Sequence, residues 1–358
     1  MPRSKSRVTS LDVAHAAGVS QSVVSRAFTP GGKVAASTRR RVHAVAAELG
    51  YRPNILARNL VKRSTNITGI VMSDIMNPFY PYVLKIFTER LRALGHQVLL
   101  FSLTDPTEIN TVVTTALQYQ VAALIVVSVT LPSDVVKECT RNNLPVVLFN
   151  RYVRSPRVRA VTCDNTEGGR LVANALLDAG HRHPAFIGGR PDTSTNQDRH
   201  KGFVDRLQER GYRLATSVAR EYSYDWGFEA AHTLLSDRRT PPDAMFCAND
   251  IIAIGALDAA RHSLGLSVPG DVSIIGFDDI PAAAWPSHSL TTIRQPVDQM
   301  IDRTLALLVE ALGTDQASRD KSIELIPGSL VIRSSARLAA PGPNAEITQP
   351  SREEDRDD

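Results

Sequence analysis

Few cysteines and no long apolar run are present in this sequence, and each shortage excludes a class of protein. Only 3 Cys occur among 358 residues, at positions 139, 163 and 247 with no metal-ligand spacing. A disulfide scaffold is therefore excluded, and a reduced, cytoplasmic setting is expected. The longest stretch without charge, residues 109–133, has its unbroken apolar part at Val121–Val127, which is too short to cross a bilayer. The basic N-terminal segment MPRSKSRVTSLDVA has no apolar run behind its charges, which argues against a secretory signal.

Sequence motifs of several common enzyme classes are also missing. There is no GxGxxG after the first apolar run, no Walker A loop and no Gly-x-Ser-x-Gly. His181 and His183 lie beside no cluster of cysteines or acids, so they are interpreted as loop residues rather than metal ligands. We therefore expect no catalytic residue, no metal site and no cofactor.

The charge is unevenly distributed along a chain of otherwise ordinary composition. Its length favours two or three domains, and 43% hydrophobic and 22% charged residues are typical of a soluble globular protein. Residues 1–63 contain twelve Lys and Arg against two acids, a formal charge of +10 that leaves −6 for the rest. A compact basic segment favours binding to nucleic-acid phosphates, although a solvated basic surface or a membrane-surface patch has the same charge.

Two short helices around a tight turn are predicted in SLDVAHAAGVSQSVVSRAF, residues 10–28. Apolar residues recur at helical spacing, Gly18 ends the first helix, and Ser20 can cap the second. This is helix-turn-helix spacing. The polar side chains on the first turns of the second helix can reach base edges in a major groove; they are Gln21, Ser22 and Arg26. An ordinary helical hairpin with a polar solvent face has the same pattern.

A third helix is predicted at residues 36–49, ending at Gly50. Arg39, Arg40 and Arg41 crowd its first turn and oppose the helix dipole, which is unfavourable unless an anion is near. The following segment, YRPNILARNLVKRS at 51–64, is too short to be a stable helix alone and is expected to order against a partner.

Beyond residue 66 the pattern predicts an α/β fold with two parallel sheets. Continuous apolar strands, typical of sheets buried on both faces, are expected at 67–73, 97–101, 123–128, 145–149, 185–189, 244–248 and 272–277. A break near 161–165 separates the sheets, and the late segments 291–296 and 323–330 can cross back. Lobe 1 is expected at about 66–163 and 291–320, and lobe 2 at about 164–290 and 321–338. The Pro- and acid-rich tail, 339–358, is expected to be disordered.

Polar and aromatic side chains follow the predicted strands, where open α/β sheets bind ligands. They are Asn77, Phe79, Tyr80, Asn150, Arg151, Asn249, Asp250, Asp278, Asp279 and Gln295. Each alone is more often a helix cap or loop residue. Together, amides, cations, acids and aromatic faces suit the hydroxyl groups and C–H surfaces of a carbohydrate rather than catalysis.

The runs VTSLDVAHAAGVSQSVVSRAF (8–28) and VAASTRRRVHAVAAELGYRPNILARNL (34–60) resemble the LacI/GalR family of bacterial transcription regulators. The resemblance covers residues 8–338 and implies a helix-turn-helix head at 1–52, a hinge helix at 53–65 and an effector-binding and dimerisation domain at 66–338. It implies that Gln21, Ser22 and Arg26 read the major groove. Phosphate contacts are implied for Thr9, Ser25 and Thr38, and minor-groove contacts for Asn54, Ala57 and Leu60, with Leu60 as the wedge at the central base step. Ala35 and Val23 depart from the usual Ser and Thr.

The body resembles sugar receptors of the periplasmic ribose-binding type, which implies a ligand between its lobes. By this resemblance, the ligand contacts are Asn77, Phe79, Tyr80, Asn150, Arg151, Arg199, Tyr222, Asn249, Asp278 and Gln295. Asn150 stands where such receptors often have Asp. Trp285 either walls the ligand cleft or belongs to the core. A purine ligand is disfavoured, because Thr193 stands where a purine-binding relative has Arg.

The resulting hypothesis is a ligand-controlled regulator, expected to act as a repressor. Its predicted partners are pseudo-palindromic double-stranded operator DNA, a small sugar or sugar-acid effector, and a second copy of the chain, with no membrane. Helix 79–94 and the stretch after Asp105 are expected at the dimer interface. The alternatives are a sugar-binding protein without DNA activity, against which the +10 head argues, and a sugar-modifying enzyme.

Overall fold

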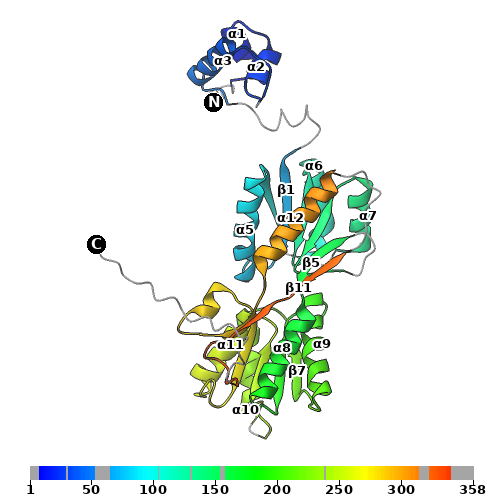
Figure 1. Cartoon of the computed structure of the whole chain (residues 1–358), viewed down its shortest axis with the longest axis vertical. Coiled ribbons are helices and arrows are strands. Elements are labelled where there is room, and N and C mark those ends of the chain that lie inside the picture. The colour runs from blue at the N-terminus through cyan, green and yellow to red at the C-terminus, as the bar shows by residue number, and fades with distance from the viewer. Residues whose placement is uncertain are drawn as a thin grey trace, which may run out of the picture. The chain divides into compact units, whose positions relative to one another are not determined.

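The computed structural model describes residues 8–29, 31–52, 65–103, 105–129, 131–153, 158–237, 239–313 and 322–339. The chain forms two compact units, Met1–Thr65 and Asn66–Asp358 (Figure 1). We call the first the head and the second the body. The predicted hinge contacts at Asn54, Ala57 and Leu60 and the tail beyond residue 339 lie outside the described residues, so these expectations stay predictions.

The described part of the head contains three helices, α1 (Ser10–Ala16), α2 (Gln21–Ala27) and α3 (Ala36–Glu48). The turn between α1 and α2 passes through Gly18 at φ +62°, a conformation that glycine adopts without strain. Ser20 is the N-cap of α2 as predicted, but its side chain makes no capping hydrogen bond. The buried side chains that pack the helices together are Val13, Ala14, Ala17, Val24, Ala27, Val42 and Ala46. The predicted helix-turn-helix is therefore confirmed as a three-helix core.

The body is built on two six-stranded sheets, each of which carries one lobe. Sheet A has the order β11-β5-β4-β3-β1-β2 and sheet B the order β12-β10-β9-β8-β6-β7. The strands of sheet A are β1 (Ile67–Ser73), β2 (Gln97–Leu103), β3 (Ala123–Val127), β4 (Val146–Phe149), β5 (Arg159–Cys163) and β11 (Ile323–Ile326). Those of sheet B are β6 (Pro184–Gly188), β7 (Thr216–Ala219), β8 (Ala244–Cys247), β9 (Ser273–Asp278), β10 (Thr291–Arg294) and β12 (Ser329–Val331). Neighbouring strands pair in parallel except β10 and β12, which are antiparallel.

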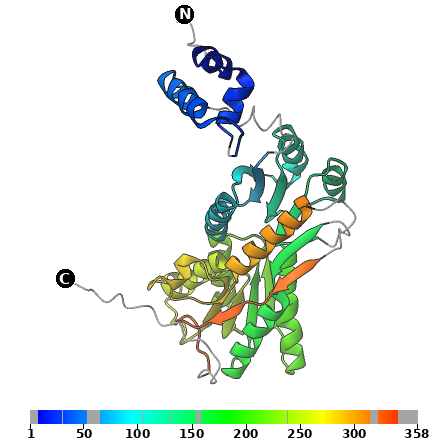
Figure 2. The same ribbon diagram turned by 45° about the horizontal axis from the view of Figure 1, so that its top comes forward.

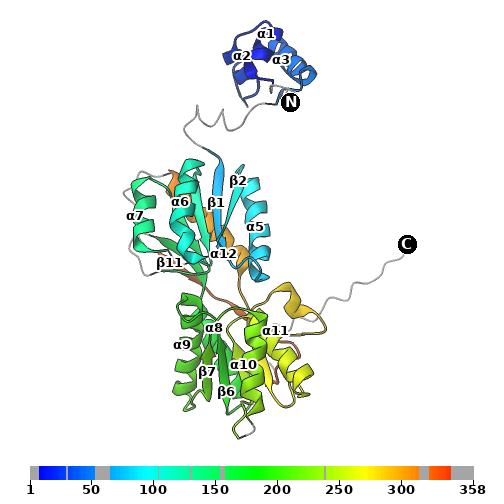
Figure 3. The ribbon, with the colours of Figure 1, turned by 180° about the vertical axis from the view of Figure 1, so that it is seen from behind.

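Helices cover both faces of sheet A, as its apolar strands require. The helices of this lobe are α5 (Phe79–Ala93), α6 (Ile109–Gln118), α7 (Ser133–Arg141) and α12 (Val297–Gly313), with a short 3-10 turn at Pro106–Glu108. Alternate strand residues point to opposite faces: Ile70 and Ile125 pack with α5, whereas Val71 and Val126 pack with α6 and α7. Figures 1 and 3 show α12 on one face of the sheet, with α6 and α7 on the other.

In the lobe of sheet B the helices pack as two close pairs. They are α8 (Asn165–Asp178) with α9 (Ser194–Glu209), and α10 (Tyr224–Ser236) with α11 (Asp250–Asp258). A π-helical turn at Ala259–Ser263 extends α11, and a 3-10 turn at Pro281–Ala284 follows β9. Figure 2 shows α8 and α9 side by side. Glycine allows the close approach, since a Cβ on Gly202 of α9 would lie 1.9 Å from the backbone oxygen of Thr166.

The predicted lobe boundaries at 291 and 321 are wrong. Residues 291–294 form β10, which pairs with β9 in sheet B, so this strand belongs to lobe 2. Residues 323–326 form β11, which pairs with β5 in sheet A and belongs to lobe 1. The predicted strand 323–330 is two strands on different sheets, separated by Pro327 and Gly328, because proline cannot donate to a strand ladder. The strands β5 and β7 were not predicted, and β5 fills part of the supposed break.

The chain passes between the lobes three times, after β5, after β10 and after β11. These passages lie side by side: a Cβ on Gly328 would be 2.9 Å from the carbonyl oxygen of Arg294 and 3.1 Å from the Cys163 sulfur. The carboxyl ends of strands from both sheets therefore meet around the passages, where a ligand of an open α/β sheet binds.

We expect Gly202→Ala to lower the melting temperature by several degrees, because the new methyl group would overlap α8 backbone that cannot move as a side chain can. Overpacking of this kind costs about 1–3 kcal/mol. The measurement is thermal unfolding of the full chain followed by circular dichroism. Gly313→Ala is the matched control, since a Cβ there meets nothing within 4 Å. Equal melting temperatures for the two variants would contradict the close packing of α8 on α9.

Candidate DNA-binding and effector sites

Helix α2 presents a polar face opposite its buried face. Val24 and Ala27 are buried in the head core, whereas the predicted DNA contacts Gln21, Ser22, Ser25 and Arg26 are all exposed. Their hydrogen bonds lie at the surface: Gln21 Nε2 donates to Ser10 Oγ of α1 at 2.9 Å, and Arg26 Nε donates to the Ser22 carbonyl at 3.2 Å. Exposed bonds of this kind exchange readily with other acceptors, so these side chains are available to a partner.

Thr9 already has a structural role as the N-cap of α1. Its hydroxyl donates to Asp12 Oδ2 at 2.7 Å and accepts from the Asp12 backbone N–H at 3.3 Å, which completes a capping box. The Thr9 backbone N–H also donates to Asp12 Oδ2, at 2.8 Å, and this bond and, secondarily, the hydroxyl bond lower the pKa of the Asp12 carboxyl. The phosphate contact expected of Thr9 stays a prediction.

The predicted crowding of three arginines in the first turn of α3 is wrong, because α3 begins at Ala36 and Arg40 and Arg41 lie in its second turn. Arg39 is half-buried and donates to the Gly32 carbonyl at 2.5 Å, whereas Arg40 and Arg41 are exposed. Thr38 is half-buried in the first turn. Ala35 provides no side-chain cap there, as its residue type predicts. The exposed cations Arg40 and Arg41 are available to an anion such as a DNA phosphate.

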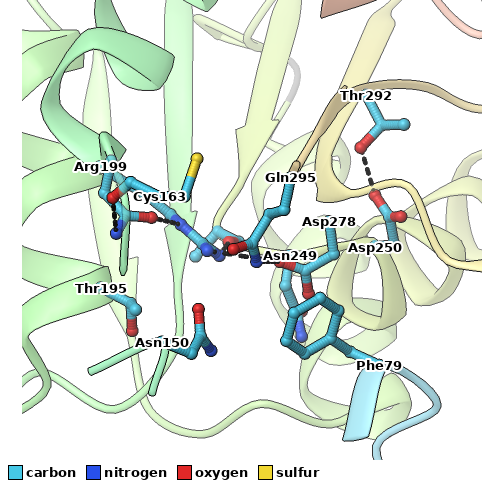
Figure 4. A network of polar contacts seen from close by, with 12 residues as sticks. Phe79, Asn150, Cys163, Thr195, Arg199, Asn249, Asp250, Asp278, Thr292 and Gln295 are labelled. Atoms are coloured by element: carbon cyan, nitrogen blue, oxygen red, sulfur yellow. Dashed lines mark hydrogen bonds and ion pairs between the residues drawn. The ribbon is translucent and has the colours of Figure 1, made fainter. Parts of the chain in front are cut away.

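In the body, the candidate effector site is centred on Arg199 of α9, which is 2% exposed. Its Nε donates to Asn165 Oδ1 at 2.8 Å, Nη1 donates to the Ala248 carbonyl, and Nη2 contacts Asp278 Oδ1 at 3.3 Å (Figure 4). The guanidinium lies 3.6 Å from the centre of the Phe277 ring. A buried cation requires such an acidic partner and a full set of acceptors.

Asp278 ends β9 at a left-handed φ of +120° and accepts from Gln295 Nε2 at 2.7 Å on the same oxygen that faces Arg199. Burial raises the pKa of the Asp278 carboxyl to about 6, and Arg199 partly opposes this shift. The neighbouring Asp250 accepts from Thr292 Oγ1 at 2.5 Å and from the Ile280 backbone N–H at 2.8 Å. Burial, and secondarily the charge of Asp278, raise the pKa of Asp250 well above its ordinary value. Asp250 thus anchors the turn that carries Asp278.

Several buried polar atoms between the lobes have no hydrogen-bond partner among the described residues. They are Asn150 Oδ1, Arg151 Nε and Gln295 Oε1. Asn150 has a left-handed φ of +69° directly after β4, and Figure 4 shows it on the same side of the network as Arg199. An unpaired buried polar group costs about 1–3 kcal/mol, so three of them at one place indicate a polar ligand or ordered water.

Aromatic side chains from both lobes complete the site. Phe79 and Tyr80 at the start of α5 are buried and in edge-to-face contact at 5.5 Å. Burial raises the pKa of Tyr80. Tyr222 of the other lobe shares hydrogen bonds of 3.1 and 3.0 Å with the hydroxyls of Thr193 and Thr195. The Arg151 guanidinium lies 5.5 Å from the centre of the Tyr222 ring, so the two lobes contact each other here.

Two predicted ligand amides already have local partners. Asn249 Oδ1 caps α11 by accepting from the Ile252 backbone N–H at 3.1 Å, and Asn77 Oδ1 accepts from the Phe79 backbone N–H at 3.2 Å. Their NH₂ groups make no recorded bond with the described residues. Trp285 is 57% exposed, so the core interpretation is wrong for it.

Sequence reasoning missed several residues of this site. Asn165 holds Arg199 but follows β5, a strand that was not predicted. Tyr152 connects the lobes: its backbone N–H donates to Ser194 Oγ at 3.1 Å, and its hydroxyl donates to Asp198 Oδ2 at 3.0 Å. Neither Ser194 nor Asp198 directly follows a strand, so a search for polar residues after predicted strands could not have found them. The spacing of α9 could have placed Ser194, Asp198 and Arg199 near one helix start.

Comparison with known proteins decides the family. The model of bacterial regulatory proteins, lacI family, matches residues 9–54, and that of a periplasmic binding protein-like domain matches 173–336. The HTH-type transcriptional regulator DegA of Bacillus subtilis is 34% identical over 82% of this chain and 88% of its own length. The HTH-type transcriptional repressor CytR of Escherichia coli is 30% identical over 94% and 98%. The chain belongs to the LacI family. As a member of this family it is a DNA-binding transcription regulator, and the predicted fold class is confirmed.

Solved structures of LacI-family proteins have the same architecture. The Lac repressor dimer bound to operator and the anti-inducer ONPF superimposes with a TM-score of 0.82, at 28% identity over 93% of this chain and 100% of that chain. The regulator CelR in complex with cellobiose superimposes with a TM-score of 0.69, at 27% identity over 92% and 100%. In the part of this LacI-family chain that the structure describes, the helices are too short or too polar to span a membrane.

Ionisation of Asp278 should destabilise the folded protein. Because its pKa is raised from 3.8 to about 6, the folded chain retains a proton that the unfolded chain loses between these pH values. Stability from this group is therefore lost as the pH rises through this window. We expect the melting temperature of Asp278→Asn, minus that of the unmodified protein, to increase from pH 4 to pH 6 and then level off. A difference that falls with pH over this range would contradict the buried carboxyl.

Proposed function

We propose that this LacI-family chain is a homodimeric, cytoplasmic repressor whose affinity for a pseudo-palindromic operator changes when a small sugar or sugar acid binds between the lobes of its body. The observation that carries the effector part is the set of buried atoms without partners at Asn150, Arg151 and Gln295, beside the paired Arg199 and Asp278. A ligand rich in hydroxyl groups would satisfy both donors and acceptors in this set.

The chemistry of the site supports a polyhydroxylated ligand. An ionised Asp278 accepts from hydroxyl donors, guanidinium groups donate to hydroxyl and ring oxygens, and amides do both. The faces of Phe79 and Tyr222 suit the C–H surface of a sugar ring. The cellobiose in CelR is a sugar of this kind bound to a LacI-family protein of similar fold.

The exposed face of α2 supports operator recognition by the head. Gln21, Ser22 and Arg26 have the side-chain types that read base edges, and Ser25 and Thr38 those that contact phosphate. A two-fold dimer would present two such faces to the halves of a palindrome, as one head supplies few base contacts. The solved Lac repressor is a dimer on its operator. A sugar-binding protein without DNA activity would not need this basic, polar face.

Arg26→Ala should remove sequence-specific DNA binding while non-specific binding persists. A binding sequence is first selected from a random duplex pool with the unmodified full chain, and affinities for that sequence and for shuffled DNA are then measured at one salt concentration. Loss of a bidentate base contact costs about 1–3 kcal/mol, on the selected sequence alone.

Arg41→Ala, an exposed arginine on α3, is the matched control for charge. It should reduce binding to both DNAs by the same factor if it contacts phosphate. An equal loss on both DNAs for Arg26→Ala would exclude its role in base recognition.

Asp278→Ala should abolish the ligand response and leave operator binding intact. A thermal-shift screen of sugars and sugar acids first identifies a ligand, since a ligand at 100 times its Kd adds about 2.7 kcal/mol of stability. Operator affinity is then measured with and without that ligand. The control is Asp134→Ala on α7, which is exposed. If Asp278→Ala still responded fully, or if nucleobases alone raised the melting temperature, the sugar proposal would have to be abandoned.

A further inference from the structure

Two buried guanidinium groups lie between the lobes, and their charges are balanced differently. Arg199 has an acidic partner, since its Nη2 lies 3.3 Å from Asp278 Oδ1. Its remaining recorded bonds go to Asn165 and to the Ala248 carbonyl, and the group is stacked on Phe277. The charge of Arg199 is thus offset within lobe 2.

Arg151 has no such partner. It is 8% exposed, and no carboxylate among the described residues lies within ion-pair distance of it. Its recorded contacts are neutral: Nη1 donates to the Ser128 carbonyl, and the guanidinium faces the Tyr222 ring. Among the described residues, neither Nε nor Nη2 of Arg151 has a hydrogen-bond partner.

Three acids interact electrostatically with Arg151 without forming an ion pair with it: Asp278, Asp192 and Asp74. Asp278 is paired with Arg199, and Asp192 is paired with Arg190 at 2.9 Å. Asp74, which follows β1, forms no ion pair with a described residue; burial raises the pKa of its carboxyl, and the charge of Arg151 partly opposes this shift. The residue before Arg151 is Asn150, an amide that adds no charge. A buried cation without a contacting anion is unfavourable, so a negative group placed against Arg151 would stabilise it.

We infer that the effector carries a carboxylate or phosphate group, and that the free Nε and Nη2 edge of Arg151 binds this anion. Nε and Nη2 form the edge of a guanidinium that binds two anionic oxygens side by side. The nearby Asn150 Oδ1 accepts from a donor, which a hydroxyl group of the same ligand supplies. The ligand class is therefore an anionic polyol: an aldonate, a uronate or a sugar phosphate. This inference rests on the proposed effector function of the interlobe site.

The test compares each neutral sugar with its own anionic derivatives. Calorimetric titration of the full chain uses glucose with gluconate, glucuronate and glucose 6-phosphate, and the same series for galactose and ribose. An anionic member should bind at least tenfold more tightly than its neutral parent, a difference of about 1.4 kcal/mol. Carboxylate and phosphate derivatives are measured separately, so the result also identifies which anion is preferred. Raising the salt concentration should weaken the anionic member alone.

Variants at two positions separate the charge from the fold. Arg151→Gln keeps a donor without charge and should lower the ratio of anionic to neutral affinity at least tenfold, because the neutral parent loses only uncharged hydrogen bonds whereas the anionic ligand loses its ionic partner. Asn150→Asp places a carboxylate beside Arg151 and should reduce anion affinity by a similar factor with the arginine retained. Arg151→Lys, which keeps the charge, should retain part of the preference. Unchanged operator binding and melting temperature show that each variant is folded.

The outcomes distinguish this inference from the proposed function. If neutral sugars bind as tightly as their anionic derivatives, or if both Arg151→Gln and Asn150→Asp leave the ratio unchanged, the anionic effector is excluded while the sugar effector stands. If no sugar or derivative binds, or if the bound ligand is insensitive to Asp278→Ala, the proposed effector function itself fails.

Discussion

The effector site depends on one buried interaction, the contact of the Arg199 guanidinium with Asp278. A cation that is 2% exposed must find an acid and enough acceptors inside the protein, and Arg199 finds them on three different segments. Asn165 comes from the start of α8, the Ala248 carbonyl follows β8, and Asp278 ends β9. Gln295, directly after β10, binds the same Asp278 oxygen. The ion pair and its hydrogen bonds thus connect the ends of three strands of sheet B with α8 and α9.

The Arg199–Asp278 contact also places the site beside the three passages of the chain between the lobes. The passages after β5, β10 and β11 lie within contact distance of one another at Cys163, Arg294 and Gly328. Arg199 is held next to them, whereas Asn150, Arg151 and Tyr152 approach from lobe 1. Tyr152 contacts Asp198 and Ser194 across the gap, and Arg151 contacts Tyr222. A ligand that binds groups of both lobes favours one lobe arrangement, and regulation requires such a differential affinity.

The head differs from the body in the size of its core and of the side chains that form it. Its core consists of small side chains such as Ala14, Ala17 and Ala46, which bring three short helices close together. A core of this size provides little stability, so few surface positions are constrained by packing. The exposed positions of α2 and the exposed Arg40 and Arg41 of α3 are thereby available for recognition of an anionic partner.

The sequence alone determined the local elements and the residue types of the site. Apolar runs such as ITGIVMS can only be buried strands, and they formed within one or two residues of the predicted bounds. Polar residues after these strands, among them Asn150, Asp278 and Gln295, could be found because the carboxyl ends of parallel strands meet at one edge of a sheet. The helix-turn-helix could be predicted because its small residues and Gly18 are local in sequence.

The tertiary structure decided which strands and which charged side chains pair with one another. Short apolar segments such as 291–294 and 323–326 fit either sheet, so their lobes depend on long-range hydrogen bonding that periodicity does not record. The edge strand β7 has alternating, half-exposed residues and gives a weak signal. Arg199 and Asp278 are separated by 79 residues, and only the fold brings them together. The same holds for Arg151. Its charge is visible in the sequence, but only the structure shows that no described carboxylate lies within ion-pair distance of it, because pairing depends on distance in space.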